Sequence, residues 1–185
     1  LENRDVLAQS QTGSGKTAAY AFPILNQLNS SRTGEISTLV LAPTRELAIQ
    51  VADAFKDYGR GLPVSVLPIY GGQHYGTSRK RLKEGVDIIV GTPGRLNDLI
   101  RQGILDLSQV RTVVLDEADE MLSMGFVEEV ESILNTTPVQ RQTALFSATL
   151  PVQIRRLADA YLKDPATVLV QNKQLTVDTV DQRYY

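Results

Sequence analysis

The sequence contains no cysteine and only one histidine, His74. The absence of thiols excludes a disulfide framework and a thiolate metal site, and it is compatible with a reducing compartment without requiring one. One histidine cannot build a histidine-rich metal site. No apolar run approaches the roughly twenty residues that a membrane-spanning helix needs, and the N-terminus lacks the basic-then-apolar layout of a signal peptide. We therefore expect a cytoplasmic protein with no membrane partner.

The chain also lacks an excess of basic charge. Its 19 Lys and Arg residues stand against 21 Asp and Glu residues, which gives a formal net charge of −2. Dedicated nucleic-acid binders usually carry a basic excess or a basic face, so any nucleic-acid binding must be local or shared with another domain. An apolar fraction of 42% and a charged fraction of 22% are those of an ordinary globular protein. With 185 residues, one compact domain is expected.

Continuous apolar runs alternate with segments of helical spacing along the chain. The runs, rich in Val, Ile and Leu, lie at residues 39–41, 64–67, 86–90, 113–115, 144–146 and 168–170. Because they are continuous, they predict strands buried on both faces. Helical spacing is seen in Leu47, Val51 and Phe55, and again in Ile154, Leu157, Ala158 and Tyr161. The alternation predicts a mostly parallel sheet with helices on both faces, a three-layer α/β fold.

Residues 10–17 have the pattern of a phosphate-binding loop. They read Ser-Gln-Thr-Gly-Ser-Gly-Lys-Thr, and they lie between the apolar stretch 6–8 and the helical segment 18–28. This is the strand-loop-helix context that such a loop requires. The two glycines, Gly13 and Gly15, allow backbone N–H groups to turn inward around phosphates at a helix N-terminus, whose dipole also favours anions.

Within this loop, Lys16 is expected to reach the β- and γ-phosphates, and the Thr17 hydroxyl to bind Mg²⁺. Ser10 stands where the common pattern has glycine, and a small residue there still fits. The alternative is a chance Gly-Lys-Thr turn in a glycine-rich loop. The predicted nucleotide-binding residues are Thr12, Gly13, Ser14, Gly15, Lys16 and Thr17.

An acidic cluster, Asp-Glu-Ala-Asp at residues 116–119, follows the apolar run 113–115. In phosphate-loop NTPases a carboxylate at this place holds Mg²⁺, which makes Asp116 the candidate metal ligand. The neighbouring Glu117 is then placed to orient and deprotonate the attacking water. The alternative is the acidic start of a solvated helix, because Asp and Glu favour a first helical turn. The cluster alone does not separate these interpretations.

The letters of residues 116–119 are those that name the DEAD-box family of RNA helicases, and the chain resembles this family at further motifs in the family's order. These are Pro43-Thr44-Arg45-Glu46-Leu47-Ala48, Gly71-Gly72, Thr92-Pro93-Gly94-Arg95 and Ser147-Ala148-Thr149. Residues 119–126 are particularly similar to bacterial members of the cold-shock type. The resemblance covers essentially the whole chain, and it implies a RecA-like P-loop NTPase domain that binds ATP and Mg²⁺.

Five motifs begin directly after an apolar run, at Ser10, Pro43, Thr92, Asp116 and Ser147. In a parallel sheet the positions that follow the strands share one edge. Ligands of open α/β sheets bind at that edge. The phosphate loop, the acidic cluster and the other motifs are therefore expected to converge.

The resemblance also implies contacts with the RNA backbone, through main-chain amides at the first motif and through the guanidinium of Arg95. Backbone contact positions a strand without reading its sequence, and amides need no lysines, which eases the objection from net charge. The same motifs are ordinary helix-entry and turn signals, so a purely structural role is the alternative. The predicted RNA-binding residues are Pro43, Thr44, Arg45, Gly72, Thr92, Pro93, Gly94 and Arg95.

By the same resemblance, the hydroxyls of Ser147 and Thr149 hydrogen-bond to Asp119 and couple the two sites. The alternative is that this motif caps the helix after Pro151, and both can hold.

Three other features are expected to be structural. The basic run Arg79, Lys80, Arg81 and Lys83 is expected to be a solvated helix face. His74 is expected at a helix entry or on the surface. Tyr20 and Phe22 are expected in the core rather than as adenine platforms.

The resemblance implies that residues 1–176 form the first RecA-like domain and that residues 177–185 begin a linker to a second one. ATP and RNA would close the two domains and separate a short RNA duplex locally. Family members read adenine upstream of the phosphate loop and carry an arginine finger on the second domain, so the isolated chain is expected to hydrolyse ATP poorly. The alternatives are a related ATPase that acts on DNA, and an RNA clamp that binds without useful turnover.

Overall fold

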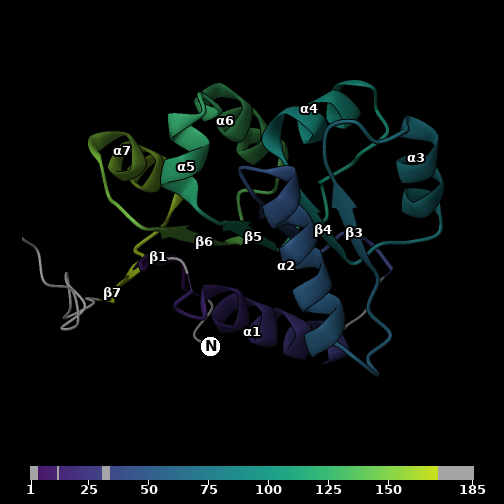
Figure 1. Ribbon diagram of the computed structural model, residues 1–185, viewed down its shortest axis with the longest axis horizontal. Coiled ribbons are helices and arrows are strands. Elements are labelled where there is room, and N and C mark those ends of the chain that lie inside the picture. Colours follow the sequence, from purple (N-terminus) through teal and green to yellow (C-terminus); the bar gives the residue numbers. More distant parts are fainter. Residues whose placement is uncertain (1–3, 12, 31–33, 171–185) are drawn as a thin grey trace, which may run out of the picture.

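The computed structural model describes residues 4–11, 13–30 and 34–170, and these residues form one sheet covered by helices on both faces (Figure 1). Every strand pairing is parallel, in the order β3-β4-β2-β5-β6-β1-β7. This confirms the predicted three-layer α/β fold. The strands are β1 (Val6–Gln9), β2 (Thr38–Leu41), β3 (Val66–Ile69), β4 (Ile88–Gly91), β5 (Thr112–Leu115), β6 (Gln142–Ser147) and β7 (Ala166–Leu169).

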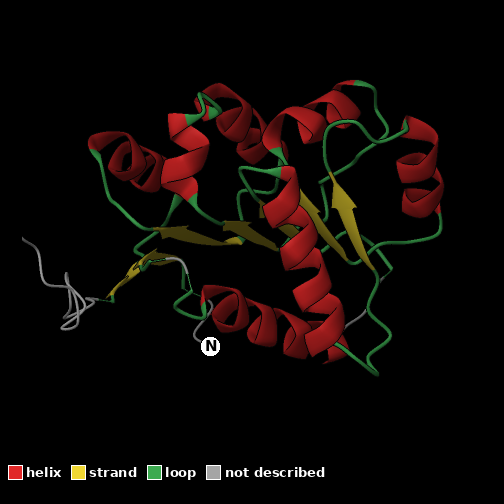
Figure 2. Ribbon diagram, viewed as in Figure 1, coloured by secondary structure: helices red, strands yellow, loops and turns green. Residues whose placement is uncertain are grey.

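The helices separate into two layers, which Figure 2 shows in red on either side of the yellow strands. Apolar side chains of α1 and α2 pack with one face of the sheet, and those of α4, α5, α6 and α7 pack with the other. None of the described helices is long and apolar enough to cross a membrane. Their bounds are α1 (Lys16–Ser30), α2 (Arg45–Tyr58), α3 (Tyr75–Lys83), α4 (Pro93–Arg101), α5 (Ala118–Ser123), α6 (Val127–Thr136) and α7 (Val152–Tyr161).

Burial is complete only in the middle of the sheet. All residues of β2, β4 and β5 are buried, as their continuous apolar sequences predict. At one edge, β3 carries Pro68, whose missing N–H is tolerated on an edge strand. At the other edge, Val168 and Leu169 of β7 are exposed, so the prediction that this run is buried on both faces was wrong. A strand at the rim has no covering helix layer on its outer side.

The two aromatic residues of α1 differ in the same way. Tyr20 is buried as expected, but Phe22 is 54% exposed and packs on the Tyr58 ring at 4.8 Å between centroids. Two residues along a helix correspond to a rotation of about 200°, so side chains at this spacing face opposite sides. The expectation that Phe22 lies in the core was wrong for this reason.

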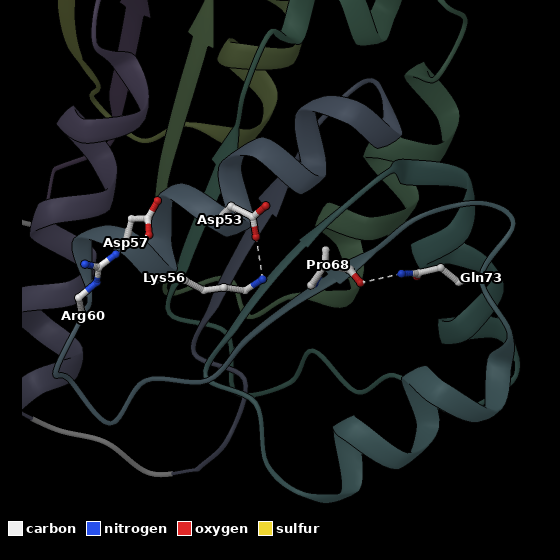
Figure 3. Close-up of polar contacts among 6 residues, drawn as sticks. All are labelled: Asp53, Lys56, Asp57, Arg60, Pro68 and Gln73. Atoms are coloured by element: carbon white, nitrogen blue, oxygen red, sulfur yellow. Dashed lines mark hydrogen bonds and ion pairs between the residues drawn. The ribbon is translucent and has the colours of Figure 1, made fainter.

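The basic run of α3 is exposed, and His74 occupies the N-cap position of that helix without a side-chain cap. Both observations agree with the structural roles expected of these residues. Other surface charges pair locally, such as Lys56 with Asp53 at 2.8 Å and Arg60 with Asp57 at 3.3 Å (Figure 3). Exposed pairs of this kind contribute about 0–1 kcal/mol each. The fold therefore depends on its apolar layers.

Gly91, the last residue of β4, has no room for a side chain. A Cβ atom there would lie 2.7 Å from the carbonyl oxygen of Ile69 and 3.0 Å from both terminal methyl carbons of Leu96. Because the carbonyl belongs to the neighbouring strand, relief requires the sheet to move. We predict that Gly91→Ala lowers the free energy of unfolding in urea by about 1–3 kcal/mol.

The matched control is Gly76→Ala in α3, where the added Cβ meets nothing within 4 Å. Alanine is the better helix former there, so its unfolding free energy is expected to stay level or to rise slightly. Equal stability of the two variants would contradict the steric argument.

Candidate functional site

The phosphate loop joins β1 to α1 at the carboxyl edge of the sheet. Its first residue extends the ladder, since the Ser10 N–H donates to the Ser147 carbonyl at 2.9 Å. Gly13 and Gly15 have φ of 78° and 85°, a left-handed conformation that favours glycine, and a Cβ on either would meet nothing within 4 Å. The loop surface is thus open main chain. Thr12 lies outside the described residues, and Ser14 is exposed.

Lys16, the first residue of α1, lies deep in the site. Its side chain is 8% exposed, and its ammonium nitrogen is buried without a hydrogen-bond partner among the described residues. Thr17 follows it and is half-buried. An unpaired buried polar group costs about 1–3 kcal/mol, and considerably more when it is charged. A buried ammonium beside an open amide loop therefore indicates an anionic ligand.

Asp116 follows β5 and is 2% exposed. Its N–H continues the ladder to the Leu41 carbonyl at 3.0 Å, and its Oδ2 accepts a hydrogen bond of 2.8 Å from the Tyr20 hydroxyl. The other oxygen, Oδ1, is buried without a partner among the described residues. Burial raises the pKa of Asp116, while the Tyr20 hydrogen bond and the charge of Lys16 oppose the rise. The free oxygen fits a cationic ligand.

Glu117 adopts a left-handed conformation, with φ 50° and ψ 51°. For a residue other than glycine this costs on the order of 1–2 kcal/mol, and such strain is concentrated at functional sites. Burial raises its pKa, with contributions from Glu120 and Asp116 that Lys16 opposes. The alternative interpretation, an acidic helix start, also agrees with the structure, because α5 begins at the next residue and has acidic residues in its first turn. An acidic helix start and a raised carboxylate pKa coexist here.

Asp119 links the acidic cluster to the Ser147-Ala148-Thr149 motif. It accepts hydrogen bonds from the Thr149 hydroxyl at 2.8 Å, from the Thr149 N–H at 2.9 Å and from the Ala148 N–H at 3.4 Å. Partial burial tends to raise the pKa of Asp119, but the hydrogen bonds outweigh it and hold the pKa below its ordinary value. The Ser147 hydroxyl donates to the Thr149 carbonyl at 2.6 Å. The motif does not cap α7, which starts after Pro151 without a side-chain cap.

An open pocket of about 420 Å³ lies beside these groups. A larger one, of about 810 Å³, lies at the opposite edge of the sheet, where α1 meets the starts of β2, β5 and β6, and it contains none of the motif residues. The smaller pocket is the one that the chemistry identifies. It is lined by Lys16, Glu117, Asp119, Glu120, Leu122, Ser123, Ala148, Thr149, Pro151 and Gln153.

The predicted RNA-binding residues occupy the same edge, after β2, β3 and β4, but few of their side chains are free. Thr44 caps α2 by accepting from the Leu47 N–H at 3.2 Å, and Pro43 and Pro93 are buried. Thr92 occupies the N-cap position of α4, with the half-buried Gly94 in the first turn.

The glycine loop and the two arginines complete this surface. Gly72 is exposed, with φ 83°. The exposed Arg45 lies over the Tyr70 ring at 4.9 Å, whereas Arg95 is buried against Tyr75. Of the predicted RNA-binding residues, Arg45 and Gly72 are exposed, and the others are half-buried or buried.

Sequence reasoning missed several residues at both sites. Tyr20 was assigned to the core alone, although it lies one helical turn after Lys16 and hence on the same face of α1. Its hydroxyl bond to Asp116 joins positions 96 residues apart, which no local pattern reveals. Tyr70, Gln73 and Tyr75 were missed as well. Their signal was the placement of aromatic and amide side chains around the Gly71-Gly72 pair.

Comparison with known proteins agrees with this geometry. Residues 1–157 match the family model described as DEAD/DEAH box helicase. The chain is 50% identical over its whole length to the ATP-dependent RNA helicase DeaD of Buchnera aphidicola (subsp. Schizaphis graminum) and to the DEAD-box ATP-dependent RNA helicase CshA of Geobacillus kaustophilus. It covers 31% and 39% of those proteins, so it spans about a third of the relatives' length.

Solved structures give the same result. A DEAD box protein from Methanococcus jannaschii superposes with a TM-score of 0.86 at 42% identity, over 91% of this chain and 46% of that one. A hypothetical ATP-dependent RNA helicase from Sulfolobus tokodaii gives a TM-score of 0.83 at 41% identity, over 91% of this chain and 48% of that one. With the family model matching most of its length, the chain belongs to the DEAD/DEAH box helicase family.

Proposed function

We propose that this chain is the first RecA-like domain of an ATP-dependent RNA helicase, which couples ATP hydrolysis to local unwinding of RNA. The observation that carries the proposal is a pair of buried groups beside the phosphate loop, the Lys16 ammonium and the Asp116 Oδ1. Neither has a hydrogen-bond partner among the described residues. These groups are a cation for phosphate and an oxygen for a metal ion, at one edge of one sheet. Relatives named as ATP-dependent RNA helicases support the choice of reaction and substrate.

The site has the ligands that Mg²⁺ uses when it binds together with a nucleotide. Among the described residues no group of three or more His, Cys, Asp or Glu could hold a metal ion. Mg²⁺ commonly binds through one or two carboxylates together with phosphate oxygens and water. We assign Asp116 and the Thr17 hydroxyl to it. The ion would supply charge neutralisation at the phosphates, and the Lys16 ammonium would bind the same anionic group.

Glu117 is assigned as the general base. It would orient a water molecule toward the terminal phosphate and take its proton on the carboxylate, and a raised pKa makes that carboxylate a better proton acceptor near neutral pH. Asp119 would couple ATP hydrolysis to the RNA-binding surface through Thr149, because their hydrogen bond joins the acidic cluster to the segment that follows β6.

RNA is proposed to bind along the main chain at residues 43–45, 71–72 and 92–94, where the starts of α2 and α4 and the exposed glycines present N–H groups. Pro43 and Pro93 have no N–H, and the Thr92 N–H donates to the Ile69 carbonyl at 3.0 Å. A second RecA-like domain is proposed to close over ATP and RNA, in line with the greater length of the relatives. Linker residues 177–185 lie outside the described residues. The domain boundary there and the cytoplasmic location stay predictions.

The test is ATP hydrolysis by the full-length protein with single-stranded RNA, with single-stranded DNA and with neither. RNA alone is expected to stimulate turnover. Lys16→Ala is expected to abolish it by removing the phosphate cation, and Glu117→Gln by removing the base, with losses of at least 10²-fold.

Equal stimulation by DNA would move the assignment to a DNA-acting ATPase. Binding of RNA without turnover by the unmutated protein would identify a clamp. The isolated 185-residue chain is a further control, expected to turn over far more slowly because an arginine finger contributes about 10³–10⁵ in rate.

The Tyr20 hydroxyl is expected to stabilise the ligand-free fold by holding Asp116. Tyr20→Phe keeps the ring contacts with Phe55 and Phe146 but removes the donor to a buried carboxylate. We expect a loss of about 1–3 kcal/mol in the free energy of unfolding, measured in urea without nucleotide. Tyr58→Phe removes an exposed hydroxyl and is expected to change it by less than about 0.5 kcal/mol. Equal effects of the two variants on the free energy of unfolding would contradict the role of the Tyr20 hydroxyl in holding Asp116.

The Thr149 hydroxyl is expected to lower the pKa of Asp119. A carboxylate whose folded pKa lies below its unfolded value stabilises the fold above that unfolded value, and this contribution is lost as the pH falls through the folded pKa. Thr149→Ala is expected to move the Asp119 pKa up toward its ordinary value, as followed by NMR titration of the carboxyl carbon. Thr149→Ser keeps the hydroxyl and is expected to leave it low. An unshifted pKa in the alanine variant would contradict this role of the Thr149 hydroxyl and leave the Ser147 hydroxyl and the backbone amides as the groups that lower the pKa.

A further inference from the structure

Arg95 is the buried arginine of the predicted RNA surface. It is 9% exposed, its guanidinium lies 3.7 Å from the centroid of the Tyr75 ring, and its Nη2 donates a hydrogen bond to the Gln73 carbonyl. Its Nε is buried without a hydrogen-bond partner among the described residues. A phosphate that bound Nη2 would have to displace the Gln73 carbonyl. The side chain is therefore committed to the loop between β3 and α3.

That loop, residues 70–74, is braced from inside by Gln73. The Gln73 amide accepts from the Tyr70 N–H at 3.1 Å and donates to the Pro68 carbonyl at 3.3 Å. Figure 3 shows Gln73 reaching back along the chain to Pro68, at the end of β3. The side chain closes the turn over its own strand. The adjacent Gly71 and Gly72 are exposed, and a Cβ on either would meet nothing.

Two arginines support this loop from outside, one from each neighbouring helix start. Arg45 opens α2 and lies over Tyr70, while Arg95 stands in the first turn of α4 and lies over Tyr75. Cation–π contacts are stronger where the cation is desolvated, and Arg95 is the buried member of the pair. It also carries the charge-assisted hydrogen bond, which is stronger than a neutral one. Arg95 is thus the main tie between α4 and the glycine loop.

We propose that Arg95 is a positioning residue, which acts with Tyr75 to hold the Gly71-Gly72 amides against the N-terminus of α4, so that RNA phosphates meet preformed main chain rather than the guanidinium. The inference rests on the proposed RNA function. It assigns Tyr75 and Gln73 to the RNA site, and it changes the role of Arg95 from ligand to support. Preformed amides bind an anion without an ordering cost at the moment of binding.

The first test is the affinity of the full-length protein for a single-stranded RNA, with a non-hydrolysable ATP analogue, at several salt concentrations. Arg95→Gln and Tyr75→Leu are each expected to weaken binding by about tenfold, the scale of one desolvated cation–π contact with its hydrogen bond. The double variant is expected to be no weaker than either single one, because both break the same unit. Tyr75→Phe keeps the ring and is expected to bind like the parent.

The salt dependence separates support from direct contact. A residue that pairs with an RNA phosphate contributes about 0.7 to the slope of log affinity against log salt. Arg95→Gln is expected to leave that slope unchanged. A slope reduced by about this amount, with normal binding by Tyr75→Leu, would overturn the proposal and make Arg95 a phosphate ligand.

Hydrogen exchange of the free protein tests the support without RNA. The Tyr70 amide is hydrogen-bonded to Gln73, and peptides covering residues 70–76 are expected to exchange faster in Arg95→Gln and Tyr75→Leu but not in Tyr75→Phe. Unchanged exchange would overturn the proposal. Absence of RNA binding by the unmutated protein, with faster exchange in the variants, would refute the RNA function while keeping the structural tie.

Discussion

The common direction of the strands is the constraint from which the rest of the molecule follows. Each of the six strand pairings among the described residues runs parallel, so each of the strands β1 to β6 delivers the chain to the same edge before a helix returns it. Positions as distant in sequence as Ser10 and Ser147 become hydrogen-bonded neighbours there. Because the loops at that edge run from a strand of the sheet into a helix, a glycine turn there has a defined place.

At that edge the protein holds groups that weaken the fold. Lys16 and Asp116 are buried without full hydrogen bonding, and Glu117 is held in a left-handed conformation. Each is unfavourable on its own, and the proposed ligands, a phosphate group and a positive ion, would pair with the Lys16 ammonium and the Asp116 carboxylate. On the proposed RNA side, Arg95 has internal partners for part of its guanidinium, the Gln73 carbonyl and the Tyr75 ring. Main-chain amides need no lysines, so a net charge of −2 is compatible with the proposed binding of a polyanion.

Much of this arrangement is readable from the sequence, for a physical reason. Continuous apolar runs such as residues 113–115 indicate burial on both faces when the strand lies in the middle of the sheet, so the layers and the parallel topology follow from local pattern. Edges are different. Val168 and Phe22 are as apolar as core residues, and only the final position of β7 and the rotation of α1 decide that they meet solvent.

The direction of a polar side chain is also set by distant partners. Nothing near residue 95 in the sequence indicates that the arginine turns toward Tyr75, and nothing near Tyr20 indicates a carboxylate 96 residues away. The motifs lie together at one edge of the sheet as expected, but the pairing of side chains among them depends on the assembled sheet. Candidate ligand-binding residues are thus easier to find from the sequence than the residues that position their side chains.

The buried charged groups of the proposed phosphate site would make the stability of the folded domain depend on bound nucleotide. A ligand that binds only the folded chain adds stability that grows with its concentration, about 2.7 kcal/mol when it is present at 100 times its dissociation constant. Here the added stability includes new partners for the Lys16 ammonium and the Asp116 Oδ1, which have no hydrogen-bond partner among the described residues. A cell rich in ATP would keep the domain folded and resistant to proteases, and starvation would shorten its lifetime. The residues proposed to bind the nucleotide would then make the abundance of the protein respond to energy supply.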